Sequence, residues 1–350
     1  QLPQSRCNPQ MATELCQQDL GHVFRGLHDA GIFADERTFR LFDDAIYMFH
    51  MPAFFLISGL LFRTREWSSF ASRSAWNIVL PYFLWGAVVI SLQIALSSAA
   101  NADATWGNLL WLPIKPYSIF WFLYALLLIQ IVAQLVLPYK HGAWLLLGFG
   151  VVAALAEQSV LPKGLGALNS ASTFLVYFAI GHILSKAAKT NQGSAWGATA
   201  SLIAFVCIDL TAIALEVPVE GLAGRCIGLV LAMLFVGIFI FTPQLRAWRA
   251  FRKIGEDTIA IYCLHTIFTA GTRVVLVKAG VSSLPLHVMA AFAAGLIGPL
   301  VAFEIARRMG ITKYLGFGAT PVARKSGETT TSTIVEPAVV TSPSSQIGGD

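Results

Sequence analysis

The sequence predicts an all-α polytopic membrane protein, a bundle of helices that cross a lipid bilayer. Hydrophobic residues make up 56% of the 350 residues, charged residues make up only 12%, and the mean hydropathy is +0.66. A soluble protein has about twice this share of charged residues, so most of the chain is expected to lie in lipid. The apolar segments lack the alternation of apolar and polar residues that membrane β-barrels show, so the spans are predicted to be helices.

Nine apolar segments approach the roughly 20 residues that a helix needs to cross a bilayer. The predicted spans are residues 45–62, 78–99, 118–137, 143–161, 173–188, 195–215, 226–241, 258–277 and 284–306. The fourth, fifth and seventh are short or interrupted, so the sequence defines their limits less sharply than those of the others.

The chain is predicted to have three parts. Residues 1–43 form an N-terminal segment and an external loop, and residues 44–310 form the helical bundle. Residues 311–350 are rich in Ser, Thr, Pro and Gly towards their end, GETTTSTIVEPAVVTSPSSQIGGD. Such a stretch cannot bury enough apolar area to offset the entropy of ordering it, so the tail is predicted to be disordered.

The basic residues predict which side of the membrane each loop occupies. The loops that follow the first, third, fifth, seventh and ninth spans carry fifteen Lys and Arg residues, whereas the loops that follow the even-numbered spans carry four. Short loops rich in Lys and Arg remain in the cytoplasm. The C-terminus is therefore predicted to be cytoplasmic, and the first readable span is predicted to enter the membrane from outside.

His22 lies in a stretch, LGHVFRGLHDAGIF (residues 20–33), that resembles the outer end of a membrane helix. The preceding residues, QLPQSRCNPQMATELCQQD, are too polar to cross a bilayer, although the charge asymmetry places His22 outside. We therefore expect that an N-terminal helix is missing or altered in this sequence and that its outer end survives around His22. The alternative is an amphipathic surface segment that never had such a helix.

Polar residues inside apolar spans are costly in lipid and are therefore candidate functional residues. The stretch FHMPAFFLISGLLFRTR (residues 49–65) carries His50 about two turns below the outer surface. It also carries Ser58 beside Gly59, a pair that permits close helix contact. Structural hydrogen bonding by His50 and packing by Ser58 are the alternatives to a functional role.

Two further segments carry candidate residues. Trp121 and Tyr124 lie one helical turn apart at an outer end, where they form either a stacking platform for a sugar ring or part of the aromatic belt of a membrane protein. Thr258, Tyr262 and His265 share one face of the penultimate span, with His265 near the middle of the bilayer. For His265, too, two roles remain open: a structural hydrogen bond, or part of a polar path through the membrane.

Several function classes lack support. The net charge of +5 comes from basic residues between the spans, where they set orientation, so no nucleic-acid partner is predicted. No phosphate-binding loop, GxSxG elbow, CxxC pair or HExxH helix is present in the sequence, so no metal site is predicted.

Five sequence blocks resemble the acyltransferase 3 superfamily of integral membrane O-acyltransferases, especially its fucose 4-O-acetylase-like branch. They occur in the family order between residue 20 and about residue 268 and read HMPAFFLISGLLF, WNIVLPYFLWG, FWFLYALLL, LVYFAIGHIL and IGEDTIAIYCLH. The resemblance implies a ten-helix bundle in the bacterial inner membrane. It further implies transfer of an acyl group, usually acetyl, from acetyl-CoA or another acyl-CoA in the cytoplasm. The acceptor would be a hydroxyl of an envelope glycan or a lipid-linked sugar outside.

The resemblance also implies roles for individual residues. His22 matches the family's essential histidine by its Gly-His-Val setting, but the basic residue about three turns earlier has no counterpart, and Met11 stands roughly in its place. Acyl transfer to an alcohol requires a base and donors for the developing oxyanion. We expect His22 to act as base or transient acyl carrier and His50 to assist it.

The remaining candidate residues are expected to bind the substrates or to form a polar path. Trp121 and Tyr124 are expected to bind the acceptor. Arg63 and Arg73 are expected to bind the coenzyme A phosphates, because guanidinium groups bind phosphate bidentately. The alternatives are a side chain that only reaches the membrane surface for Arg63 and an orientation-setting role for Arg73. The expected polar path comprises Ser58, Tyr262 and His265.

Two other function classes remain open. A transporter or flippase of a small polar or lipid-linked substrate would use intramembrane histidines as a proton path, but it predicts inverted repeats or paired broken helices, which are not evident. A non-catalytic membrane sensor derived from the same fold is the third class. The sequence predicts neither the acyl chain length nor the oligomeric state.

Overall fold

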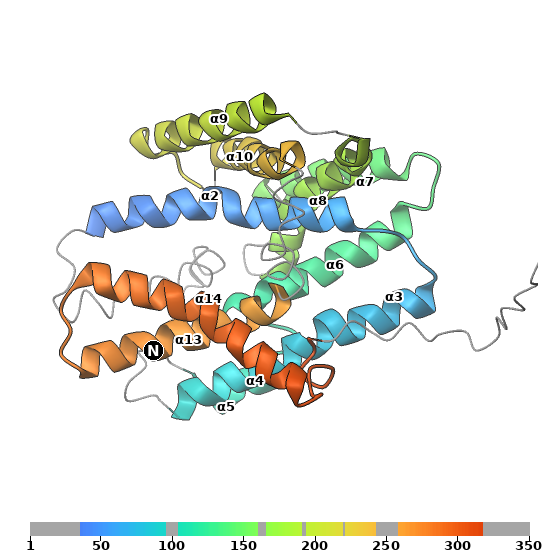
Figure 1. The fold of residues 1–350 in the computed structure, drawn as a ribbon. Coiled ribbons are helices and arrows are strands. Elements are labelled where there is room, and N and C mark those ends of the chain that lie inside the picture. The colour runs from blue at the N-terminus through green and yellow to red at the C-terminus, as the bar shows by residue number, and fades with distance from the viewer. Residues whose placement is uncertain are drawn as a thin grey trace, which may run out of the picture. The chain divides into compact units, whose positions relative to one another are not determined.

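The computed structural model describes residues 36–95, 104–159, 166–190, 194–219, 221–242 and 258–317. The regular structure in these ranges is helical, with a π-helix η1 and a 3-10 helix η2 (Figure 1). In chain order the elements are α2 (Glu36–Leu61), α3 (Trp67–Ser74), η1 (Ala75–Val79), α4 (Leu80–Ala95), α5 (Trp106–Trp111), η2 (Ser118–Phe120), α6 (Trp121–Val136), α7 (Gly142–Ser159), α8 (Ala167–Thr190), α9 (Ala195–Ala214), α10 (Leu222–Phe241), α13 (Thr258–Lys278) and α14 (Leu284–Arg308). The segment around His22, where the sequence predicts a missing or altered N-terminal helix, lies outside the described residues.

Eight helices or continuous helical stretches in the described ranges are long and apolar enough to cross a membrane. They confirm the predicted all-α polytopic class, and each coincides with one of the predicted spans. The predicted fourth span is also a helix, α7, but its apolar part, Gly142–Glu157, is shorter than the others. At 1.5 Å per residue this part is about 24 Å long, less than the roughly 30 Å of a hydrocarbon core.

Several helices begin earlier than the predicted spans, and the difference is largest for the first two spans. α2 begins at Glu36 rather than near residue 45, because no Gly or Pro interrupts the chain before Pro52. The second span begins at Trp67 rather than near residue 78, because α3, η1 and α4 form one continuous helical stretch. Its π-helical turn lies directly before Pro81, whose ring would clash with the carbonyl of residue 77 in a regular α-helix.

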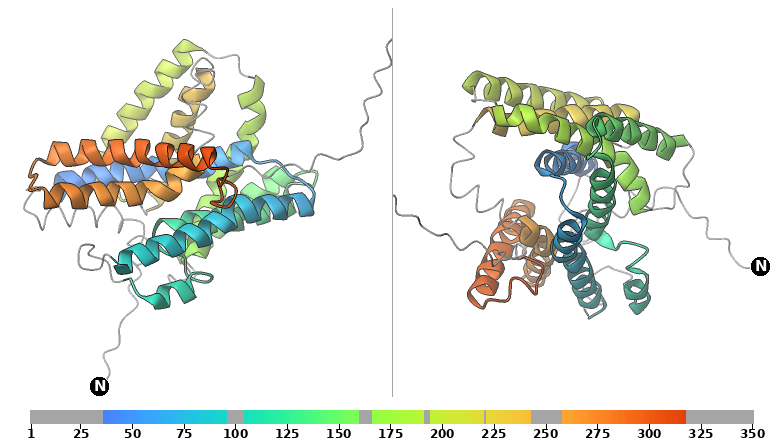
Figure 2. Two further views of the ribbon diagram at one scale, coloured as in Figure 1. Left: turned by 60° about the horizontal axis from the view of Figure 1, so that its bottom comes forward. Right: turned by 90° about the vertical axis from the view of Figure 1, so that its right-hand side faces the viewer.

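α2 is the central helix of the packing. It contacts α8 on one side and α10 on another, while α6 and α7 pack on α8 and α9 packs on α10. α13 pairs with α14, as the two orange ribbons of Figure 2 show, and also touches α4. Phe55, Phe120 and Phe178 are fully buried in the main hydrophobic core, to which α2, η2 and α8 contribute.

Two glycines allow α2 and α8 to touch backbone to backbone. A Cβ atom on Gly59 would lie 1.9 Å from the carbonyl oxygen of Phe178, and one on Gly181 would lie 1.9 Å from that of Leu56. The helices could not approach this closely with any other residue at either position. The close contact expected of Gly59 is therefore confirmed, and Gly181 is its counterpart on α8.

The packed chain continues past residue 310, where the bundle was expected to end. The buried ring of Phe317 stacks on Trp85 at 5.4 Å between centroids, and the Trp85 Nε1–H donates to the carbonyl of Leu315 at 3.1 Å. Lys313 lies over the ring of Trp76, 5.1 Å from its centroid. Residues 311–317, which follow α14, thus pack against the helical stretch formed by η1 and α4.

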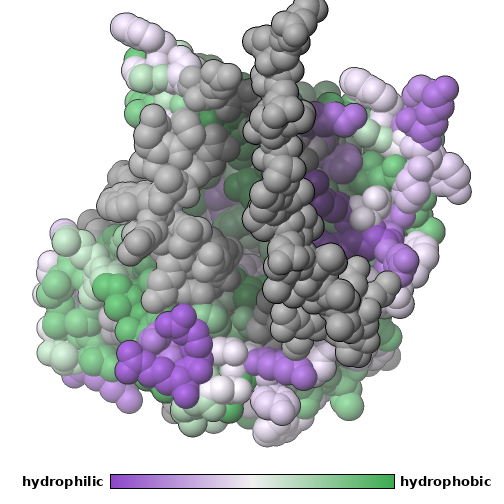
Figure 3. All heavy atoms as spheres, turned by 45° about the vertical axis from the view of Figure 1, so that its right-hand side comes forward, coloured by the Kyte–Doolittle hydropathy of each residue, from purple (hydrophilic) through white to green (hydrophobic). Residues whose placement is uncertain are grey.

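The surface is suited to lipid. Exposed hydrophobic side chains are frequent on α9 and α14, for example Trp196, Leu210 and Phe292. Hydrophobic residues also cover broad areas of the face seen in Figure 3, and hydrophilic residues form separate groups there. An exposed apolar surface of this extent marks a membrane-contacting protein.

Candidate functional site

His50 is oriented by its own helix. Its Nδ1 lies 2.8 Å from the carbonyl oxygen of Ile46, one turn earlier in α2, and its ring packs edge-on against Tyr47 at 4.7 Å between centroids. A carbonyl oxygen can only accept a hydrogen bond, so Nδ1 carries the proton. The lone pair of His50 is then on Nε2, and this is the tautomer that can act as a base.

His265 on α13 is held in the same way. Its Nδ1 lies 2.8 Å from the carbonyl oxygen of Tyr262 and 3.1 Å from that of Ile261. These contacts again place the proton on Nδ1 and the lone pair on Nε2.

The two histidines come from distant parts of the sequence but belong to one group of rings. Phe54 contacts both His50, at 6.3 Å between centroids, and Phe122, at 5.8 Å. Phe122 in turn contacts Tyr262 at 5.4 Å, and Tyr262 lies 6.2 Å from His265. We call these five residues on α2, α6 and α13 the histidine site.

Tyr262 also fixes the start of α6. Its hydroxyl donates to the carbonyl of Ile119 in η2. The preceding residue, Ser118, has a φ of +50°, a left-handed conformation that is costly for a residue with a Cβ atom. The hydrogen bond therefore stabilises the turn that sets the position of Phe122 in the histidine site.

The predicted acceptor residues do not form a joint platform. Trp121 is only 8% exposed and faces α8, where its ring lies 5.8 Å from that of Phe174. Tyr124 faces α4 instead: its ring lies 5.6 Å from that of Tyr82, and its hydroxyl donates to the carbonyl of Pro113 at 3.4 Å. Their acceptor-binding role stays a prediction.

The other predicted residues lie towards the opposite end of α2. Ser58 is eight residues beyond His50, about 12 Å along the helix axis. Arg63 is exposed in the loop after α2, and Arg73 is half-buried in the last turn of α3. The structure therefore brings His50, Tyr262 and His265 together and separates them from the two arginines. His22 lies outside the described residues.

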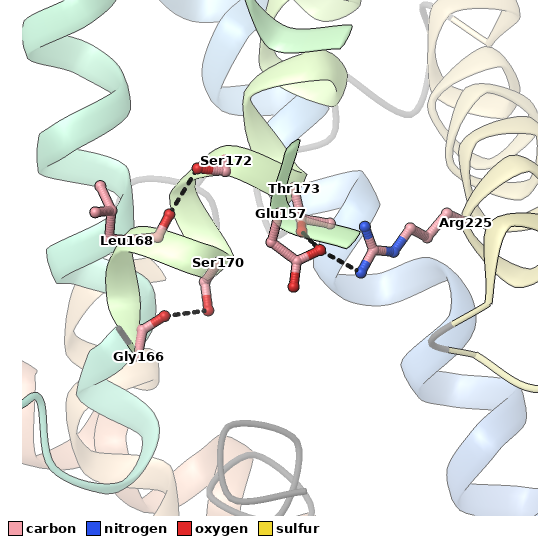
Figure 4. Close-up of polar contacts among 7 residues, drawn as sticks. All are labelled: Glu157, Gly166, Leu168, Ser170, Ser172, Thr173 and Arg225. Carbon is pink, nitrogen blue, oxygen red and sulfur yellow. Dashed lines mark hydrogen bonds and ion pairs between the residues drawn. The ribbon is translucent and has the colours of Figure 1, made fainter. Parts of the chain in front are cut away.

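The structure contains an ion pair, with a further hydrogen bond, that joins α7, α8 and α10. The sequence did not predict it. Oε2 of Glu157 accepts from Nη2 of Arg225 at 2.8 Å and from Oγ1 of Thr173 at 3.4 Å (Figure 4). The Tyr177 hydroxyl donates to the Arg225 carbonyl at 3.0 Å. The signal in the sequence was one carboxylate at the end of an apolar segment and one arginine at the start of another, a combination that is rare in lipid unless the two are paired.

Breaking this ion pair should destabilise the protein. The side chains of Arg225 and Glu157 are only 20% and 16% exposed, so Arg225→Met would leave a mostly buried carboxylate without compensation and cost about 3 kcal/mol. The double variant Arg225→Met, Glu157→Gln removes both charges and should recover part of that loss. Thermal unfolding in detergent measures both effects. Equal losses in the single and double variants would contradict a stabilising pair.

The comparisons with known proteins agree with this architecture. A family described as an acyltransferase domain matches residues 20–304, a range that includes His22 and every residue of the histidine site. Searches of curated proteins and of solved structures found no match to the chain. The family match covers most of the 350 residues, and the described helices are those of a multi-pass membrane protein. The chain therefore belongs to the acyltransferase 3 family of membrane acyltransferases.

Proposed function

We propose that the protein is an O-acyltransferase of the fucose 4-O-acetylase-like branch, with acetyl-CoA or a related acyl-CoA as donor. The acceptor is a hydroxyl of an envelope glycan or a lipid-linked sugar, and the protein works in the bacterial inner membrane with its C-terminus in the cytoplasm. The observation that carries the proposal is the histidine site: two imidazoles from different helices, each with Nδ1 bonded to a carbonyl, within a chain of the acyltransferase 3 family.

The reaction requires two proton transfers: the acceptor hydroxyl loses a proton, and the departing thiolate gains one. Nε2 of His50 removes the proton of the acceptor hydroxyl as its oxygen bonds to the carbonyl carbon of the thioester. The carbon–sulfur bond then breaks, the ester leaves with the acceptor, and the coenzyme A thiolate takes up a proton. The His50 imidazolium supplies this proton, and the Nε2 lone pair of His265 can receive it on the way to the thiolate. His22 serves as base or transient acyl carrier in the same reaction.

The two substrates reach the histidine site from opposite ends of the bundle. Arg63 and Arg73 bind the donor phosphates at the cytoplasmic end, since guanidinium groups bind phosphate bidentately. Tyr124 and, after local opening of the α6–α8 contact, Trp121 line the acceptor side. Ser58 lies between the two ends and provides a hydroxyl on the route of the acyl group.

Reconstitution tests this proposal. The purified protein in lipid vesicles is supplied with labelled acetyl-CoA on one side and a set of lipid-linked and soluble sugars on the other. Label is expected in an alkali-sensitive ester on a sugar. Movement of an unmodified sugar across the vesicle membrane, with no label transferred from acetyl-CoA or from longer acyl-CoA donors, would contradict the proposal and support the transporter alternative.

A further inference from the structure

A buried glutamine holds the loop between α2 and α3. Oε1 of Gln134 accepts a hydrogen bond from the Arg65 backbone N–H at 3.3 Å, and its Nε2 donates to the Arg65 carbonyl. Gln134 lies in the last turn of α6 and is only 3% exposed. Its side-chain amide thus forms two hydrogen bonds with the backbone of one residue in a separate segment. It accepts one and donates one, as a neighbouring backbone would.

Packing alone does not account for a glutamine at this position. α6 is otherwise strongly apolar, WFLYALLLIQIVAQLV, and a leucine would fill similar space without the cost of burying an amide. The amide is instead used on both sides, because its oxygen accepts from the Arg65 N–H and its nitrogen donates to the Arg65 carbonyl. The contact therefore fixes the backbone of the loop, residues 62–66, at the end of α6.

The fixed loop presents two arginines. Arg63 and Arg65 are both exposed, and neither forms an ion pair within the described part of the chain. The loop is not helical, and Glu66 at its end has extended backbone angles, φ −62° and ψ 144°. Arg63 and Arg65 are separated by one residue in this loop, so both side chains extend from the backbone segment that Gln134 holds.

A pair of guanidinium groups on a rigid backbone is suited to a polyphosphate group. Each guanidinium can form two parallel hydrogen bonds with phosphate oxygens. A backbone that is already ordered loses less conformational entropy on binding, which raises affinity. Arg65 was not among the predicted donor-binding residues, but its carbonyl and N–H are the atoms that Gln134 holds.

We infer that Gln134 is a positioning residue: it fixes the α2–α3 loop so that Arg63 and Arg65 together bind the phosphates of the acyl donor. The identity of that anion as coenzyme A rests on the proposed function. The fixing of the loop by Gln134 does not, and the two parts can be tested separately on the full chain in detergent or lipid.

Limited trypsin digestion tests the fixed loop. Gln134→Leu keeps the approximate volume and removes both hydrogen bonds, so cleavage after Arg63 is expected to become about tenfold faster. Gln130→Leu is the matched control, one turn earlier on the same helix and without a hydrogen bond to the described loop residues, and its cleavage rate should equal that of the parent. Gln134→Glu keeps an acceptor for the Arg65 N–H and should be intermediate. Equal cleavage in Gln134→Leu and Gln130→Leu would overturn the inference.

Coenzyme A alone is the probe for the anion site. It should slow cleavage after Arg63 in the parent and in Gln130→Leu, and about tenfold more should be required in Gln134→Leu. In the acyl-transfer assay Gln134→Leu should raise KM for acyl-CoA about tenfold with little change in kcat. If coenzyme A protects none of these proteins, the phosphate-binding role is wrong even if trypsin confirms the fixed loop. Protection without any acyl transfer would count against the proposed function and not against this site.

Discussion

Replacing His50 with alanine is expected to lower the rate of acyl transfer at least about a hundredfold without preventing folding. A general base contributes about 10²- to 10⁴-fold to such a reaction, and Nε2 of His50 is the proposed base. The ring is only partly buried and its hydrogen bond lies within its own helix, so its loss leaves no other side chain unpaired. The measurement is kcat for transfer from labelled acyl-CoA, with thermal unfolding as the test of folding.

Matched histidine variants make this experiment specific. His141 is exposed in the turn between α6 and α7, remote in sequence from the histidine site, and His141→Ala should retain parental activity. His265→Ala should lower kcat less than His50→Ala, and the double variant should be no worse than about the stronger single variant, because residues that act as a unit are not additive. Parental activity in His50→Ala would remove this residue from the mechanism.

Replacing Gly181 with alanine is expected to destabilise the whole bundle by about 3 kcal/mol or more. The new Cβ would lie 1.9 Å from the carbonyl oxygen of Leu56, and a backbone atom of a central helix cannot move aside as a flexible side chain can. α8 would have to separate from α2, and the contacts of both helices would loosen. Thermal unfolding and the yield of monodisperse protein measure the loss. Gly59→Ala makes the reciprocal clash and should behave in the same way.

The same substitution elsewhere provides the control. A Cβ on Gly148, within α7, would meet nothing within 4 Å. Gly148→Ala should therefore stabilise the helix by about 0.5 to 1 kcal/mol, because alanine has the higher helix propensity. Similar stability of Gly148→Ala and Gly181→Ala would show that helix propensity, and not the close crossing, governs both positions.

The sequence predicted the fold class and the positions of the spans because burial in lipid requires long apolar segments. It failed at helix ends that depend on other forces. Residues 36–44 include several charged groups and so do not read as a span, yet no residue there stops a helix and α2 begins at Glu36. Phe317 reads as part of a polar tail, and only the tertiary contact with Trp85 reveals that the bundle includes it.

The histidine site was predictable only in part. His50, Tyr262 and His265 stood out because polar groups are rare in apolar spans. Phe54 and Phe122, which connect them, are indistinguishable by sequence from aromatic residues that face lipid. Trp121 and Tyr124 are three residues apart, and the sequence could not reveal that one faces α8 and the other α4. Glu157 and Arg225 form a pair that only the packing of α7 against its neighbours brings together.

The π-helical turn at residues 75–79 absorbs one residue in the helical stretch from α3 to α4. A π-turn accommodates one residue more than a regular turn. The residues before it therefore face nearly the same way relative to α4 as they would in a regular helix with one residue fewer. In a regular helix of the present length, the additional residue would instead rotate Arg73 by about 100° relative to α4. A one-residue gap at this position in a related protein would thus be compatible with an unchanged direction of the basic group.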